Sequence, residues 1–169
     1  MFITQLQQIV QIAAEKEAEN DAFKVFLQAA NITDIDVLVS ELNKQVEQAI
    51  DCTQCGNCCK TLLINVSKER AKQLANYLQQ SVQKFEETYI EKGSNGMMLM
   101  NTIPCHFLND NSCTVYEHRF DGCREFPGLN LPNFTQRLFT VFMHYTRCPI
   151  VFNVIEQLKI TTGFADDLQ

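Results

Sequence analysis

A dense run of cysteines in the first half of the chain constrains its fold more than any other feature. Four thiols lie within eight residues, in the sequence Cys52-Thr-Gln-Cys55-Gly-Asn-Cys58-Cys59. Two CxxC pairs overlap in this run, and CxxC spacing lets two sulfurs converge on one metal ion about 2.3 Å away. An isolated cysteine is more often a small buried apolar residue, but a run of this density predicts metal-binding chemistry.

Four further cysteines lie in separate segments downstream, so the chain must fold back on itself before they can share a site with the run. A chain of 169 residues buries enough surface to fold without disulfide bonds, so we expect its eight cysteines to have a chemical role. By count, they match two four-cysteine sites, or one site with spare thiols. The candidate metal ligands are Cys52, Cys55, Cys58, Cys59, Cys105, Cys113, Cys123 and Cys148.

The local arrangement of the run has two alternatives. On a helix, Cys52, Cys55 and Cys59 form a single stripe, and Cys58 points away from it. In a loop that wraps a cluster, Cys52, Cys55 and Cys58 converge instead, as in ferredoxin-like C-x2-C-x2-C runs. Gly56 costs about 1 kcal/mol inside a helix, which favours the loop but does not exclude the helix.

A remote ligand and nearby cations would complete such a site. In ferredoxin-like runs the remote fourth cysteine precedes a proline, and Cys148 precedes Pro149 here. Four thiolates around a divalent ion leave a net charge of about −2, which nearby cations would offset. We expect Arg124, next to Cys123, to lie within reach of the thiolates. The basic residues near the cysteines in sequence are Lys60, Arg119, Arg124 and Arg147.

Several cysteine blocks together resemble a known family. Three blocks follow the central run, and they read CHFL from Cys105, CTVYEHR from Cys113 and CREFP from Cys123. With the run at residues 52–60, these blocks resemble the CxxCxxCC (YkgJ-type) family of zinc- or iron-chelating cysteine-cluster proteins. The resemblance spans about residues 50–150. It implies metal chelation, with zinc and an iron–sulfur cluster both proposed for the family, and it implies no single reaction.

Two positions depart from the usual family pattern. His106 stands where the family usually has proline, and Phe120 stands in place of the proline that follows the arginine. The first change could add a ligand or loosen a turn, and the second relaxes the backbone before Cys123. Neither departure removes a cysteine.

Apolar residues outside the cysteine blocks recur mostly at helical spacing, which predicts a mainly α fold. We expect a small helical domain around an irregular cysteine-rich metal site, with one short β-hairpin where 97–107 and 113–116 flank the polar turn at 109–112. Asn20 could divide the first helical stretch in two. The expected helical stretches are residues 2–30, 35–50, 67–78, 84–92, 132–145 and 149–158.

We expect all of these parts to form one globular domain. Residues 1–50 are an N-terminal helical arm packed on the core and could also bind a protein partner. Residues 51–150 are the cysteine-cluster metal-binding region, and residues 151–169 are a C-terminal helix or tail.

The charge and the N-terminal sequence exclude other classes of protein. A formal net charge of −6 opposes nucleic-acid binding, which needs a dense basic surface. The apolar stretches are too short to span a membrane, and the N-terminus has no basic leader. We therefore expect a cytoplasmic protein without a membrane partner, in a compartment where cysteines stay reduced and bind metals more often than they form disulfides.

Three functions fit these observations. The first is a zinc or iron–sulfur protein whose metal site is mainly structural or chelating. The second is an iron–sulfur protein that transfers electrons or assists a redox enzyme. The third, a metal-free thiol-redox protein, is disfavoured because Cys52 and Cys55 follow a helix, and a helix C-terminus opposes thiolate formation.

Overall fold

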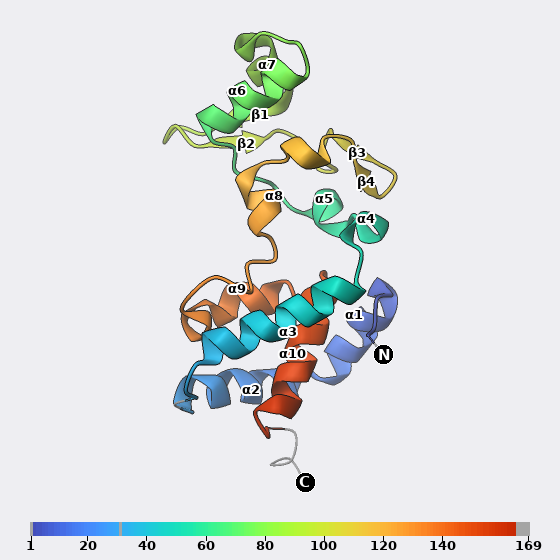
Figure 1. The fold of residues 1–169 in the computed structure, drawn as a ribbon, viewed down its shortest axis with the longest axis vertical. Coiled ribbons are helices and arrows are strands. Elements are labelled where there is room, and N and C mark those ends of the chain that lie inside the picture. The colour runs from blue at the N-terminus through green and yellow to red at the C-terminus, as the bar shows by residue number, and fades with distance from the viewer. Residues whose placement is uncertain (1, 31, 165–169) are drawn as a thin grey trace. The chain divides into compact units, whose positions relative to one another are not determined.

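The computed structural model describes residues 2–30 and 32–164, so residues 165–169 of the expected C-terminal tail lie outside it. The chain divides into two compact units (Figure 1). The first unit combines Met1–Asp51 with Pro127–Gln169, and the second is formed by Cys52–Phe126. Helices dominate both units, and the described part of the chain adds two small antiparallel sheets, which confirms the expected fold class. No helix described is long and apolar enough to cross a bilayer.

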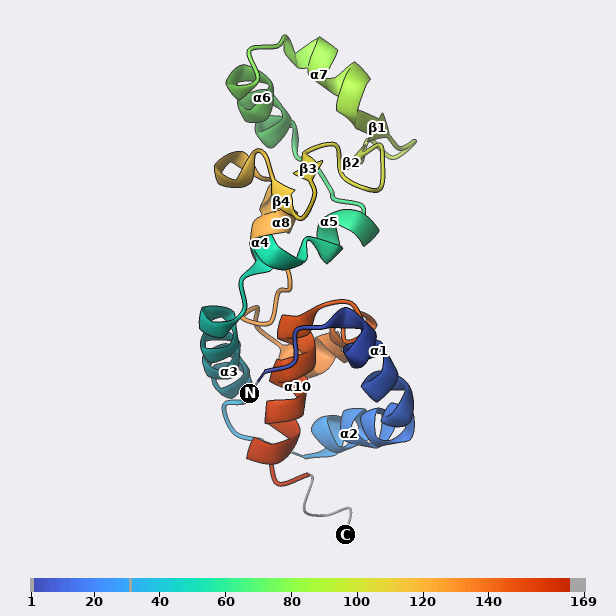
Figure 2. The same ribbon diagram turned by 90° about the vertical axis from the view of Figure 1, so that its right-hand side faces the viewer.

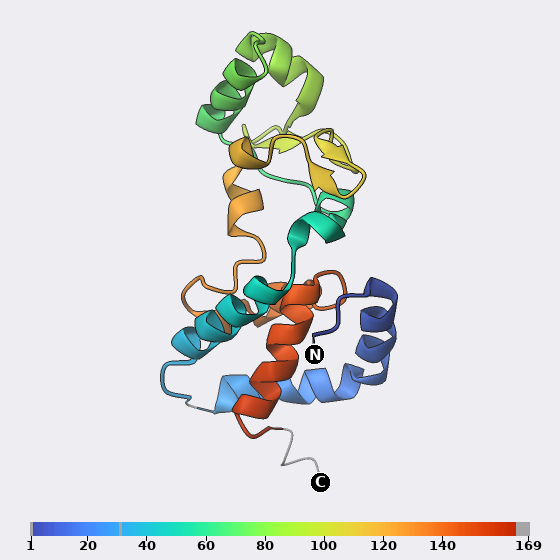
Figure 3. The ribbon, with the colours of Figure 1, turned by 45° about the vertical axis from the view of Figure 1, so that its right-hand side comes forward.

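The first unit is helical throughout. Figures 2 and 3 show α10 passing through its middle, with α3 packed against one side and α1 on another. The α10 residues Val151, Val154 and Ile155 are fully buried, which accounts for the strongly apolar sequence of this helix. Its helices are α1 (Leu6–Glu15), α2 (Glu17–Ala29), α3 (Ile35–Ala49), the 3-10 helix η2 (Phe134–Arg137), α9 (Leu138–Met143) and α10 (Pro149–Thr161).

The first helical stretch breaks at Lys16 and not at Asn20, the residue that the sequence offers as a cap. Lys16 has φ −100° and ψ 16°, between α1 and α2. Its ammonium group contacts Glu156 Oε2 of α10 at 2.6 Å. The residue at the break therefore contacts a residue 140 positions further along the chain, and such a contact cannot be predicted from the local sequence.

The second unit contains short helices and two hairpins. An apolar cluster that includes Leu74, Phe85 and Met100 forms its core. Its helices are α4 (Cys52–Cys55), α5 (Asn57–Thr61), α6 (Lys68–Tyr77), α7 (Val82–Tyr89), the 3-10 helix η1 (Tyr116–His118) and α8 (Asp121–Glu125). Its strands are β1 (Ile90–Lys92), β2 (Met98–Met100), β3 (Leu108–Asn109) and β4 (Ser112–Cys113).

Two predictions in this unit need correction. The helix expected over 84–92 ends at Tyr89, because Ile90–Lys92 pairs with β2 as a strand. The polar turn at 109–112 does form a hairpin, but its strands β3 and β4 have only two residues each. The strand within 97–107 is β2, which pairs with β1, and the contact of this segment with 113–116 is the hydrogen bond from the Thr114 N–H to the Phe107 carbonyl oxygen at 2.8 Å.

Candidate metal centre

The central cysteine run adopts neither of the two expected arrangements. It folds as two short helical turns, α4 and α5, which are separated at Gly56. Gly56 has φ +60°, a left-handed conformation that side chains other than glycine rarely adopt. A Cβ built on Gly56 would lie 2.7 Å from the carbonyl oxygen of Asn111. Glycine is therefore needed both for the turn and for a close approach of the run to the β3–β4 turn.

Hydrogen bonds hold the β3–β4 turn against the run. The Asn111 side-chain amide donates to the carbonyl oxygen of Gln54 at 3.1 Å, and Lys60 donates to Asn111 Oδ1. The Ser112 hydroxyl donates to the carbonyl oxygen of Thr53 at 3.4 Å. This docking brings Cys113, at the end of β4, beside α4.

Two other cysteines reach the same place from further segments. The backbone N–H of Cys105 donates to the carbonyl oxygen of Cys59 at 2.8 Å, which fixes the segment before β3 against α5. Cys123 lies in α8, where its own N–H donates to the carbonyl oxygen of Phe120 at 3.0 Å. Four separate segments therefore contribute cysteines to one part of the unit.

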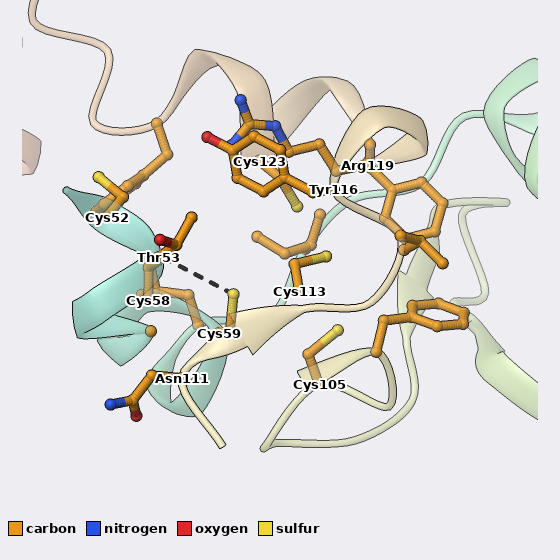
Figure 4. Close-up of a pocket in the computed structure, with 17 residues that line it drawn as sticks. Cys52, Thr53, Cys58, Cys59, Cys105, Asn111, Cys113, Tyr116, Arg119 and Cys123 are labelled. Atoms are coloured by element: carbon orange, nitrogen blue, oxygen red, sulfur yellow. Dashed lines mark hydrogen bonds between the residues drawn. The ribbon is translucent and has the colours of Figure 1, made fainter. Parts of the chain in front are cut away.

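These cysteines surround a cavity of about 80 Å³. Figure 4 shows the side chains of Cys59, Cys105, Cys113 and Cys123 around one space, with Cys52 at its edge. Apolar side chains complete the wall and limit the access of water. The lining cysteines are Cys52, Cys58, Cys59, Cys105, Cys113 and Cys123, and the apolar residues are Leu62, Ile64, Phe107, Val115, Phe120 and Phe126.

The remaining two candidate ligands do not line the cavity. Cys55 ends α4 and is half-buried. Cys148 belongs to the first unit, where it is buried and precedes the first residue of α10. Pro149 occupies the first turn of that helix, a position where proline is favoured because its missing N–H has no helical partner. Helix initiation therefore accounts for the Cys148-Pro149 pair.

The thiols raise one another's pKa. The pKa of Cys59 is raised by its hydrogen bond with Cys58, whose sulfur lies 4.0 Å away, and further by burial. Burial, with the charges of Cys59, Cys105 and Cys113, raises the pKa of Cys123 to about 12. Burial also raises the pKa of Cys105 and of Cys113, with Cys59 acting in the same direction. The thiols therefore oppose one another's ionisation, and the positive charge of Arg119 acts in the opposite direction on Cys59 and Cys113 by lowering the pKa of each.

Backbone groups favour the charged form of three of these sulfurs. Backbone hydrogen bonds from Phe107 to Cys105 and from Val115 to Cys113 lower the pKa of each thiol and oppose burial. A backbone hydrogen bond from Phe120 does the same for Cys123. Hydrogen bonds of this kind to ligand atoms are a regular feature of metal sites.

The chemistry of these donors fits a thiophilic metal ion, although their present side-chain positions do not form a closed ligand set. Among residues 2–30 and 32–164, no three Cys, His, Asp or Glu side chains are arranged so that they could hold an ion as they stand. Zinc and iron accept four thiolates. The sulfurs share one cavity, so convergence on an ion requires their side chains to move from these positions.

The arginine that lines this cavity is Arg119, whereas Arg124, which we expected within reach of the thiolates, is not among the lining residues. Arg124 is exposed and donates to the carbonyl oxygens of Glu117 and Arg119. Arg119 lines the cavity, and its guanidinium carbon lies 3.8 Å from the centre of the Tyr116 ring.

Sequence reasoning missed three residues that shape the site: Gly56 as a steric requirement, Asn111 and Tyr116. The i, i+3 spacing of Tyr116 and Arg119 could have indicated their stacking. No local signal pointed to the contact between Gly56 and Asn111, because those residues are far apart in the sequence.

The comparisons with known proteins identify a family. The model of the CxxCxxCC family, described as a putative zinc- or iron-chelating domain, matches residues 51–145. Neither the curated proteins nor the solved structures contain a match to the chain. The match covers the whole second unit from its first cysteine and more than half of the sequence. The chain therefore belongs to the CxxCxxCC family.

Proposed function

We propose that this chain chelates a zinc or iron ion in the cavity of the second unit, through Cys59, Cys105, Cys113 and Cys123. The observation that carries the proposal is that four segments each supply at least one thiol to a single cavity. In every pair within this set, the charge of one thiol raises the pKa of the other.

The site would be mainly structural or chelating. One of the four thiols lies in α5, one in the segment that precedes β3, one in β4 and one in α8. An ion held by all four would therefore connect distant parts of the second unit, whose helices and strands are short. A tetrathiolate zinc ion contributes folding energy directly when bound. The chain's own contribution is the set of converging thiols, the backbone donors to three of them and the apolar wall that limits water.

A second candidate is an iron–sulfur cluster that serves in electron transfer or as a redox accessory. Six thiols line the cavity, which is more than one tetrathiolate zinc ion needs. Cys58 and Cys52 are the additional thiols at this wall. A cluster is coloured and contains acid-labile sulfide, whereas zinc thiolate is colourless.

The test is the metal content of serine variants purified without oxygen. We expect Cys59→Ser and Cys113→Ser to retain less than about a tenth of the wild-type metal, because each removes one ligand of the set. Cys148→Ser is the matched control, since Cys148 lies in the other unit and outside the cavity lining. It should keep the wild-type metal content.

Two results would overturn the ligand assignment. The first is unchanged metal content in both cavity variants. The second is an equal loss in the Cys148→Ser control, which would indicate a general folding effect. Far-ultraviolet circular dichroism of each variant separates loss of metal from loss of fold.

A further inference from the structure

Arg119 is the cationic side chain that shares the cavity wall with the thiols. It follows η1, and its guanidinium stacks over the ring of Tyr116, which is itself partly exposed at the cavity rim. Figure 4 shows Arg119, Tyr116, Cys59 and Cys113 around the same space. A guanidinium is a planar donor that stacks well on aromatic faces, so the ring fixes its orientation.

The Nε–H of this arginine is a hydrogen-bond donor without an acceptor. Nε is buried, and it has no partner among the residues that the structure describes. Burying such a donor is costly unless an acceptor becomes available. Arg119 therefore brings a positive charge and an unused N–H group to the wall of a cavity that is lined mainly by cysteines and apolar residues.

Cys59 lines the same cavity as Arg119. Cys105, Cys113 and Cys123 each have a backbone hydrogen bond that favours their charged form. The groups that favour the charged form of Cys59 are instead the side-chain cations Arg119 and Lys60. Lys60 donates to Asn111 Oδ1 and is not among the residues that line the cavity, whereas Arg119 is one of them.

We propose that Arg119 is a positioning residue of the metal centre: its Nε–H and its charge stabilise the ion-bound sulfur of Cys59, and the Tyr116 ring holds the guanidinium in place. This role rests on the proposed function. Four thiolates and one divalent ion carry a net charge of about −2, and the positive charge of Arg119 brings the net charge of the site to about −1. Arg119 therefore raises the affinity of the site for a divalent ion without binding the ion itself.

The test is a titration of the full, metal-free chain with Co²⁺ under anaerobic conditions. We expect Arg119→Met to weaken Co²⁺ binding about 10- to 100-fold, the usual effect of removing a partner of a metal ligand. Arg119→Lys should recover part of this loss, because it restores the charge without the planar donor. Lys72→Met is the matched control, since Lys72 is exposed on α6 of the same unit and lies outside the cavity lining, and it should bind within about twofold of wild type.

The absorption spectrum distinguishes this role from a purely structural one, which would leave the wavelength of the cobalt bands unchanged. Loss of an N–H donor makes a thiolate more electron-rich, so the sulfur-to-cobalt charge-transfer band of Arg119→Met should move to longer wavelength. Binding by Arg119→Met within about twofold of wild type, with an unmoved band, would overturn the role. An equal loss in Lys72→Met would overturn it as well.

A double-mutant comparison tests the part played by Tyr116. Tyr116→Phe keeps the ring and should bind Co²⁺ like wild type, whereas Tyr116→Leu should weaken binding in the presence of Arg119 but not in the Arg119→Met background. Equal losses from Tyr116→Leu in both backgrounds would overturn the positioning role. Failure of the wild-type chain to bind Co²⁺ would instead overturn the proposed function, and this role with it.

Discussion

Gly56 shows how one residue controls the geometry of the cysteine run. Its φ of +60° is a left-handed conformation, and an added Cβ would collide with the backbone of Asn111. We expect Gly56→Ala to destabilise the folded chain by about 2–4 kcal/mol, from left-handed strain and displacement of the β3–β4 turn. Chemical denaturation of the metal-free chain measures this change in the free energy of unfolding.

Gly96 provides the matched control for this substitution. It also has a positive φ, of +79°, but a Cβ added there meets no atom within 4 Å. Gly96→Ala should therefore cost only the conformational strain, about 1–2 kcal/mol. Equal losses from the two substitutions would show that the contact with Asn111 does not matter.

At the scale of elements, a buried ion network joins α10 to α2. Lys159 is 1% exposed, and its ammonium group contacts Glu19 Oε1 at 2.7 Å, Asn20 Oδ1 at 2.6 Å and Glu156 Oε1 at 2.8 Å. We expect Lys159→Met to destabilise the chain by about 2–4 kcal/mol, because it leaves partly buried carboxylates with Lys16 as their remaining cation.

The control for this network is Lys24→Met, measured in the same denaturation experiment. Lys24 pairs with Asp21 of α2, whose side chain is 67% exposed, and such surface pairs contribute little. We expect a loss below about 1 kcal/mol. A loss from Lys159→Met no larger than from Lys24→Met would contradict a stabilising role for the network.

Elements could be predicted from sequence where local signals determine them. The apolar stripe of α3 is one case, and the N-cap of α6 is another, since the Ser67 hydroxyl accepts from the backbone N–H of Arg70 at 3.2 Å. The break at Lys16 and the strand β1 could not be predicted, because both depend on partners distant in sequence. Local spacing contains no information about such partners.

The same distinction applies to the metal centre at the scale of the whole molecule. The density of the run identified the region, and the family match over residues 51–145 agrees with it. Which thiols share a cavity depends on long-range contacts, such as the hydrogen bond from Cys105 N–H to the Cys59 carbonyl oxygen. The second unit begins at Cys52 and ends at Phe126, so the cavity and its proposed ligands belong to one continuous segment.

The measurement that tests the account most directly is elemental analysis of the wild-type chain purified without oxygen, with its visible spectrum. We predict about one zinc or iron ion per chain for a tetrathiolate site. A brown colour with iron and acid-labile sulfide would identify the bound group as a cluster. Fewer than about 0.1 zinc or iron ions per chain, with all eight thiols reactive, would contradict chelation as the function of this chain.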